Sequence, residues 1–115
     1  ATNLMDYMLI KLNNLFENLI VYPENMMRNL NLTNGLIFSQ EVLLKLVQKG
    51  ISREKAYKLV QHKAMQVWEQ KKDFKELLKL DNEISTLMSD NEIDSLFNLD
   101  KILINVDKTF ERLGL

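Results

Sequence analysis

Residues 4–20 read LMDYMLIKLNNLFENLI, and this stretch decides the fold class. Apolar side chains recur in it at intervals of three and four residues, which is the spacing of one face of an α-helix. At 100° per residue they cover an arc of roughly 160°, wider than the ~100° stripe of a typical surface helix. A helix this apolar on one side needs more than one neighbour to cover it. The residues of this apolar stripe are Leu4, Met5, Met8, Leu9, Leu12, Leu15, Phe16, Leu19 and Ile20.

Start and stop signals for further helices follow this stretch. Pro23 is expected to end or kink the first helix, because its ring removes a hydrogen-bond donor, and residues 24–30 then form a short helix. Thr33 is the expected N-cap of the next helix, which stops at Gly50. Ser52 is the expected N-cap of the helix after that.

The helix after Ser52 carries an apolar face that includes the single tryptophan. We therefore expect Trp68 to be buried in the core, where its truncation would be costly. The face consists of Ala56, Tyr57, Val60, Ala64, Val67 and Trp68.

Two more helix starts match the capping-box pattern, in which a Ser, Thr or Asp is followed three residues later by Glu. They are Asp73 with Glu76 and Ser89 with Glu92. A last helix is expected over residues 99–113. No strand-like alternation persists in the sequence, which predicts an all-α fold.

Composition narrows the class of protein. The 115 residues are 46% hydrophobic and 27% charged, as in a globular domain with one modest core. The net charge of −1 argues against a nucleic-acid partner, which selects a plainly basic surface. No apolar run is long enough to cross a bilayer, so no membrane partner is expected. The absence of cysteine excludes disulfides and cysteine-ligated metals and is typical of a reducing cytoplasm.

Charge is unevenly distributed along the chain. Residues 45–79 contain ten Lys or Arg against four Asp or Glu, and residues 80–115 contain three against eight. The lysines of this basic middle are spread around their helices. They are therefore interpreted as a solvated surface, with a steering field for an anionic ligand as the alternative.

Catalytic chemistry is not indicated by any local pattern. His62 is the only histidine, and no carboxylate or second histidine stands four residues away to share a metal with it. The serines lack the histidine-acid context of an activated nucleophile. Asp90 and Asp94 are interpreted as a solvated face rather than an acid–base pair. We therefore predict no catalytic residue and no metal site from these local patterns.

The middle of the chain resembles a known family. Residues 22–30 read YPENMMRNL, residues 33–39 read TNGLIFS and residues 50–54 read GISRE. This order and spacing closely resembles the C-terminal domain of adenylosuccinate lyases, in the fumarase/aspartase superfamily. The resemblance covers essentially all 115 residues. It continues with Val42, Leu43, Leu44, Leu46, Ala56, Tyr57, Val60, Gln61, Ala64, Met65, Trp68 and Phe74.

This resemblance implies a domain division. Residues 1–22 look like the end of the long helix that the family contributes to a central bundle, and residues 23–115 like its compact C-terminal domain of about five to six helices. Two departures are small. Asn34 stands where a second glycine is common, and Asn98-Leu99 stands where an Asp-Pro often opens the last helix.

The resemblance also implies an activity for a longer parent enzyme. That enzyme eliminates fumarate from adenylosuccinate to give AMP, and from succinylaminoimidazole carboxamide ribotide, in purine nucleotide synthesis. Its general acid is a histidine, and its general base is a serine in a loop with the signature Ser-Ser-x-Met-Pro-x-Lys-x-Asn-Pro. Nothing in this chain matches that signature, so no catalytic position is assigned. Arg28 and Asn29 are the candidates for contact with substrate.

Partners and location follow from the same resemblance. The family forms cytoplasmic homotetramers without a metal or organic cofactor. The chain opens in a helical pattern without an initiator methionine, so we expect an inactive, structural fragment of the parent. The alternative is a free-standing helical interaction module that docks through its first helix.

The first helix is the expected interface. Its end near Tyr22 should be covered by the C-terminal domain, and the rest should meet the remainder of the parent enzyme or other copies of the chain. Self-association is expected through Leu4, Met8, Leu12, Leu15 and Leu19.

Overall fold

A computed structural model describes residues 2–114. Over that range the chain forms nine α-helices, one short 3₁₀ helix (η1) and no strand, so the all-α prediction is confirmed. The elements are α1 (Thr2–Glu17), α2 (Pro23–Asn31), η1 (Leu36–Phe38), α3 (Ser39–Gln48), α4 (Arg53–Gln70), α5 (Phe74–Lys79), α6 (Asn82–Leu87), α7 (Asp90–Leu96), α8 (Leu99–Leu103) and α9 (Val106–Leu113).

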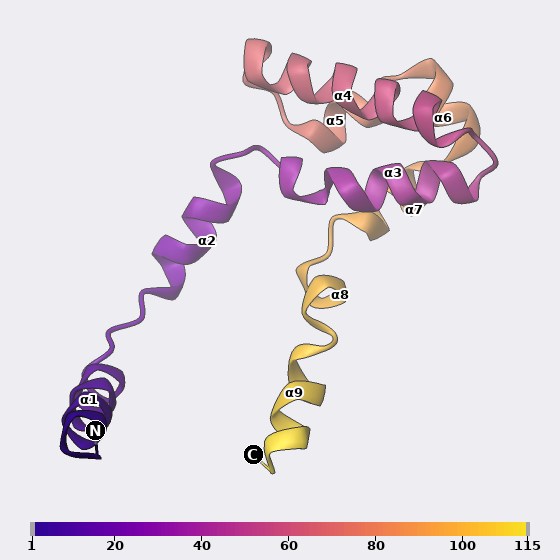
Figure 1. Ribbon diagram of the computed structural model, residues 1–115. Coiled ribbons are helices and arrows are strands. Elements are labelled where there is room, and N and C mark those ends of the chain that lie inside the picture. The colour runs from indigo at the N-terminus through magenta and orange to yellow at the C-terminus, as the bar shows by residue number, and fades with distance from the viewer. Residues whose placement is uncertain (1, 115) are drawn as a thin grey trace.

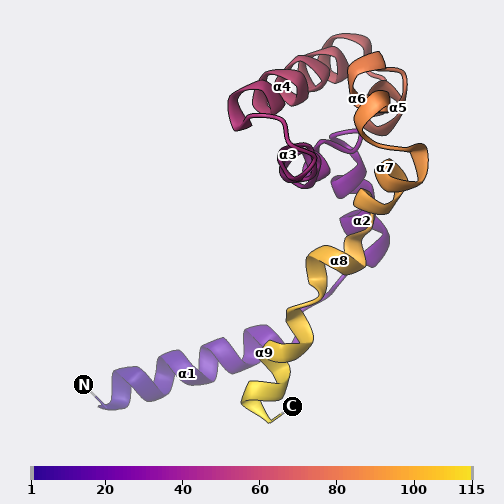
Figure 2. The same cartoon turned by 90° about the vertical axis from the view of Figure 1, so that its right-hand side faces the viewer.

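These elements form a compact body with two projecting arms (Figure 1). The body consists of η1 and α3–α7. The N-terminal arm consists of α1 and α2, and the C-terminal arm of α8 and α9. Both arms extend away from the same side of the body in the two views (Figures 1 and 2), and the principal extents of the chain are 64 × 31 × 26 Å. The outer ends of α1 and α9 therefore lie far from the body, at the tips of the arms.

The core lies wholly within the body. Helix α3 packs on α4, and α5 packs on α4, α6 and α7. Phe74, Leu46 and Leu78 are among its largest fully buried side chains. The buried core residues are Phe38, Val42, Leu46, Ala56, Val60, Val67, Phe74, Leu77, Leu78, Ile84, Met88 and Ile93.

The predicted burial of Trp68 is wrong. On α4 the core covers the row formed by Ala56, Val60 and Val67, whereas Trp68 is 65% exposed and Tyr57 is 56% exposed. Trp68 lies about 100° around the helix from Val67, so a narrow contact stripe can cover one and not the other. The apolar face of α4 is wider than the area that α3 and α5 occupy.

Three of the predicted N-caps are confirmed. The Ser52 side chain accepts a hydrogen bond from the backbone N–H of Lys55 at 3.3 Å, at the start of α4. Asp73 opens α5 and accepts the N–H groups of residues 75 and 76. Ser89 and Glu92 form a complete capping box at the start of α7. These caps work because each satisfies backbone N–H groups that a helix start leaves unpaired.

Thr33 is not an N-cap. Its hydroxyl donates instead to the carbonyl of Leu30, at 3.3 Å. The chain then passes through Asn34 (φ 48°) and Gly35 (φ 87°), both left-handed, before η1 leads into α3. Two consecutive left-handed residues cannot continue a helix, so α3 begins at Ser39.

Pro23 does not end the first helix. Helix α1 stops earlier, at Glu17, and the side chain of Asn18 donates to the carbonyl of Asn14 at 2.7 Å. Such a bond offers the backbone an alternative to a further helical turn. Pro23 instead opens α2, where its missing N–H costs nothing, and Tyr22 before it lies outside the helical region (φ −115°, ψ 85°), as a following proline favours.

The predicted last helix is interrupted. Helix α8 ends at Leu103 and α9 begins at Val106. Asn98 caps α8 by accepting the N–H of Asp100 at 2.9 Å, so an asparagine can open this helix where an Asp-Pro is common in the resembling family.

Candidate functional site

The N-terminal arm exposes the predicted apolar stripe, which lies on α1 as far as Phe16 and continues with Leu19 and Ile20 in the non-helical link. No residue of α1 is buried, and the five residues singled out for self-association are between 48% and 65% exposed. The predicted cover at the end near Tyr22 is absent among the described residues, because Ile20 is 71% and Tyr22 60% exposed. The non-helical link after Glu17 carries α1 away from the body (Figure 2), so the body cannot reach that end.

Further apolar faces lie on α2 and on the C-terminal arm. The sequence did not predict an interface there. The sequence signal was present as helical periodicity, but periodicity does not distinguish a face that packs in the chain from one that packs elsewhere. The exposed residues are Met26, Met27 and Leu30 on α2, Ile102 and Leu103 on α8, and Val106, Phe110 and Leu113 on α9. Together with α1, these exposed faces on the two arms are the candidate interaction surfaces of the described chain.

Charged groups of the body pair across helices. The lysines of the basic middle reach the carboxylates of the acidic tail, so five of the ten basic residues counted in 45–79 are in ion pairs within the described chain. This weakens the steering-field interpretation and favours a structural role for these lysines. The pairs are Lys49–Glu92 (2.6 Å), Lys55–Glu83, Lys63–Asp81 (2.8 Å), Lys75–Asp94 (3.4 Å) and Lys79–Asp94 (2.8 Å).

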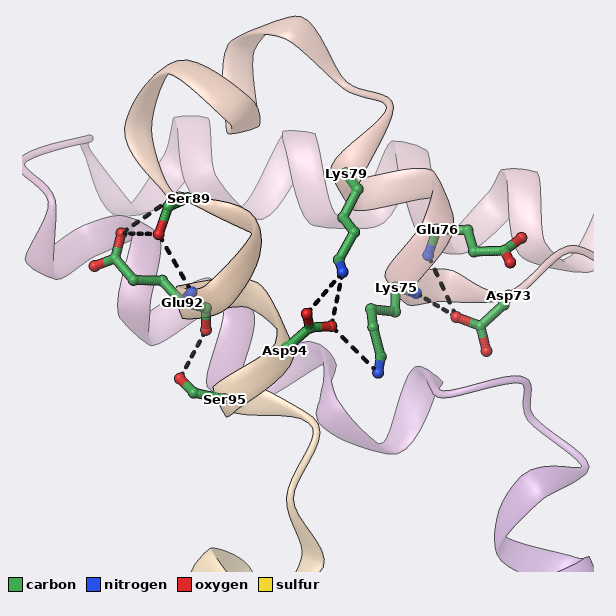
Figure 3. Close-up of polar contacts among 8 residues, drawn as sticks. All are labelled: Asp73, Lys75, Glu76, Lys79, Ser89, Glu92, Asp94 and Ser95. Atoms are coloured by element: carbon green, nitrogen blue, oxygen red, sulfur yellow. Dashed lines mark hydrogen bonds and ion pairs between the residues drawn. The ribbon is translucent and has the colours of Figure 1, made fainter.

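Two of these carboxylates, Glu92 and Asp94, lie on α7 and point to different partners (Figure 3). The hydrogen bond from Lys49, followed by that from the backbone N–H of Ser89, lowers the pKa of Glu92 from its ordinary 4.5 to about 2. The hydrogen bond from Lys79 likewise lowers the pKa of Asp94, and in return Asp94 raises the pKa of Lys79. Carboxylates with lowered pKa values are ionised at neutral pH and are poor general acids.

The other candidates from the sequence are single exposed residues. Arg28 and Asn29 are exposed on α2, and their contact with substrate stays a prediction. His62 is exposed on α4, with its Nε2 3.2 Å from the Gln66 amide nitrogen. In residues 2–114 no three His, Cys, Asp or Glu side chains are placed to hold a metal ion.

A groove of about 570 Å³ lies between α3 and α4 of the body. Tyr57 and Ala64 line it from α4, and Leu43 and Leu44 line it from α3. Its lining includes Ser39 but no histidine or carboxylate, so it lacks a base for a nucleophile. Among the described helices none is long and apolar enough to cross a lipid bilayer.

Comparison with known proteins gives a consistent result. Residues 35–113 match the family model described as "Adenylosuccinate lyase C-terminus". Over 115 residues the chain is 50% identical to adenylosuccinate lyase of Streptococcus mutans and 47% identical to that of Bacillus subtilis. It is 42% identical over 112 residues to adenylosuccinate lyase of Thermotoga maritima. The chain spans all or nearly all of its own length in these matches, but only 26–27% of the length of these relatives.

Proposed function

Because the chain belongs to the adenylosuccinate lyase C-terminal family, we propose that it is the C-terminal part of an enzyme that cleaves adenylosuccinate to AMP and fumarate. The same enzyme makes the analogous cleavage of succinylaminoimidazole carboxamide ribotide in purine nucleotide synthesis. The observation that carries the proposal is the match of the whole chain, at 47–50% identity over 115 residues, to two such lyases. A similarity of this extent is specific to the family and not to helical composition.

The part played by this chain is assembly and not bond cleavage. The general acid and base come from the remainder of the parent enzyme, since the described residues offer no nucleophile–base pair. Residues 1–22 are the end of a bundle segment whose helical part is α1 (Thr2–Glu17), and residues 23–115 form the domain that follows it. The family forms a cytoplasmic homotetramer, and this chain contributes Leu4, Met8, Leu12, Leu15 and Leu19 to the contacts between subunits.

Exposure of the arms supports this role. A contiguous exposed apolar patch beyond about 400 Å² is uncommon on a soluble monomer and usually marks an interface. Every large apolar side chain of α1 is at least 48% exposed, and no residue of α2, α8 or α9 is buried. The arms therefore need other subunits or the rest of the enzyme to cover them. Arg28 and Asn29 lie on α2, inside this surface, and a contact with substrate would have to be made there.

A chimera tests the proposed function. The aligned 115 residues of the Bacillus subtilis enzyme are replaced by this chain, and cleavage of adenylosuccinate is followed by absorbance. We expect a tetrameric, active chimera, because the chain would supply the same arms and body. A second chimera with Met8→Asp and Leu12→Asp should lose both the tetramer and the activity.

The outcomes separate the two hypotheses for the chain. A chimera that folds and assembles but is inactive would contradict the enzymatic role and favour a free-standing interaction module. The 115-residue chain alone, at micromolar concentration, should give no turnover above background. Turnover by the chain alone would mean that the catalytic groups had been misassigned.

A further inference from the structure

The two arms leave the body at one place. Residues 32–35 lead from the N-terminal arm into η1, and Phe97 is followed directly by Asn98, the N-cap of α8. Gly35 lies against the Phe97 ring, since a Cβ atom added at Gly35 would lie 3.1 Å from Phe97 Cε1. That distance is too short for an ordinary contact. The roots of the two arms, distant in sequence, therefore touch at a point where any side chain at residue 35 would push against the Phe97 ring.

Phe97 is held in this position from several sides. Its ring centroid lies 5.0 Å from that of Phe38 and 6.1 Å from that of Phe74, both in tilted arrangements. The Lys75 ammonium lies 5.3 Å from the centre of the Phe97 ring. The same ammonium pairs with Asp94, on the helix that ends just before Phe97 (Figure 3). Aromatic and cation–π contacts of this kind favour one ring orientation.

The root of the N-terminal arm is fixed to the same part of the body. The backbone N–H of Phe74 donates to the carbonyl of Asn34 at 2.9 Å. Asn34 and Gly35 both have positive φ values, 48° and 87°, which set the direction in which the chain enters η1. Phe74, at the start of α5, thus contacts both roots, one through its backbone and one through its ring.

We infer that the contact between Gly35 and Phe97 is a positioning junction that fixes the direction of α2 relative to α8. A side chain at residue 35 displaces the Phe97 ring, and α8 follows because its N-cap, Asn98, is the next residue. The junction is a property of this chain's geometry, and its use in presenting both arms to other subunits rests on the proposed function.

Distance measurement between the arms tests the junction. The chain contains no cysteine, so Asn29→Cys on α2 and Asp100→Cys on α8 give two unique sites for spin labels. Labelled chain is diluted with an excess of unlabelled chain, so that distances within one chain dominate the pulsed electron resonance signal. The unaltered chain should give a single narrow distance peak.

Two glycine variants form a matched pair. Gly35→Ala and Gly50→Ala both place alanine at a left-handed φ, 87° and 97°, but a Cβ at Gly50 meets nothing within 4 Å. Both should lower the melting temperature through backbone strain. Only Gly35→Ala should shift the distance peak or remove it. An equal effect of both, or no effect of either, would overturn the inference.

Removing the ring gives the second test. Phe97→Ala should abolish the single peak, whereas Leu96→Ala, a neighbour that is also half-buried against the core, should keep it. In a Phe97→Leu background, Gly35→Ala should cause no more change than Gly50→Ala. Circular dichroism checks that the body is folded in each variant. If Phe97→Ala unfolds the chain, the comparison of Gly35→Ala with Gly50→Ala tests the inference alone. A broad distribution in the unaltered chain would also contradict the junction, and none of these readouts depends on lyase activity.

Discussion

Helix α4 and helix α1 carry apolar residues at the same helical spacing, yet α4 packs in the core and α1 is exposed. Ala56, Val60 and Val67 of α4 are buried under α3 and α5, whereas no residue of α1 is buried. All buried residues among those described fall between Phe38 and Ile93, inside the body. Periodicity thus predicts a helix and its apolar face, but the partner that covers the face is decided by the rest of the fold or by another molecule.

The largest difference between body and arms should appear when a phenylalanine is truncated. Phe74 is fully buried, so Phe74→Ala should lower the free energy of unfolding by about 3–5 kcal/mol through lost burial and a cavity. Phe110 on α9 is 50% exposed, and Phe110→Ala should stay within about 1 kcal/mol. Urea unfolding of the two variants measures this. Equal losses would mean that the C-terminal arm packs on the body in solution.

Self-association is the next effect. The unaltered chain should at least double its mass at high micromolar concentration, because a two-fold seam is the simplest way for the α1 stripe to close. Met8→Asp/Leu12→Asp should leave it monomeric in light scattering. Asn3→Asp/Asn14→Asp adds the same charge to the opposite side of α1. This control variant should still self-associate. A strictly monomeric chain with an ordered α1 would contradict the bundle-helix interpretation.

A helix cap of the body should give a smaller loss. Ser89→Ala removes one side of the capping box at α7 and should cost about 1 kcal/mol. Ser95→Ala, in the same helix, removes only a hydroxyl that donates to the Glu92 carbonyl, and should stay within about 0.5 kcal/mol. Thermal unfolding of both variants, side by side, provides the measurement.

Acid should weaken the body through its ion pairs. The folded pKa of Glu92, about 2, lies below its ordinary 4.5. Because the folded pKa is lowered, the ionised side chain stabilises the fold above pH 4.5, and this contribution is lost as the pH falls towards 2. Glu92→Gln should therefore be less stable than the unaltered chain at neutral pH. It should also lose less stability than the unaltered chain as the pH falls from 4.5 towards 2. Glu111→Gln on α9 serves as the control, and a pH profile shared by both variants would argue against the Lys49 pair.

The smallest effect concerns the tryptophan. Trp68→Ala should change the free energy of unfolding by no more than about 0.5 kcal/mol, since its side chain is 65% exposed. Its neighbour Val67 is 2% exposed, and Val67→Ala should cost about 1.5–2 kcal/mol from two buried carbon atoms. Indole fluorescence typical of a dry environment would reverse this expectation.

The features predicted correctly from sequence are those with local causes. Ser52, Asp73 and Ser89 cap their helices because the donors they satisfy lie two or three residues away. The burial of Trp68 and the start of α3 were mispredicted because they depend on how wide a face α4 offers its neighbours and on the left-handed turn at Asn34.

The candidate site was predicted in part for the same reason. The α1 stripe is visible in a single segment and is exposed, as is every other described residue of α1, so its use as an interface stays a prediction. The ion pairs join residues that are far apart, such as Lys49 and Glu92, so nothing in the local pattern of either segment indicates them. The exposed faces on α2 and α9 could not be predicted without knowing which helices project from the body.

Because no residue of α1 is buried, the helical content of α1 should depend on association. It has 16 residues, close to the ~12–15 below which an isolated helix is marginal in water. Without tertiary packing, its helical content must come from association. Disorder-to-order coupling of this kind makes the far-ultraviolet circular dichroism rise with chain concentration, and amide hydrogens of residues 2–17 should exchange within the dead time in dilute solution while those of α3 and α4 persist. The first helix is then a reporter of assembly as well as part of it.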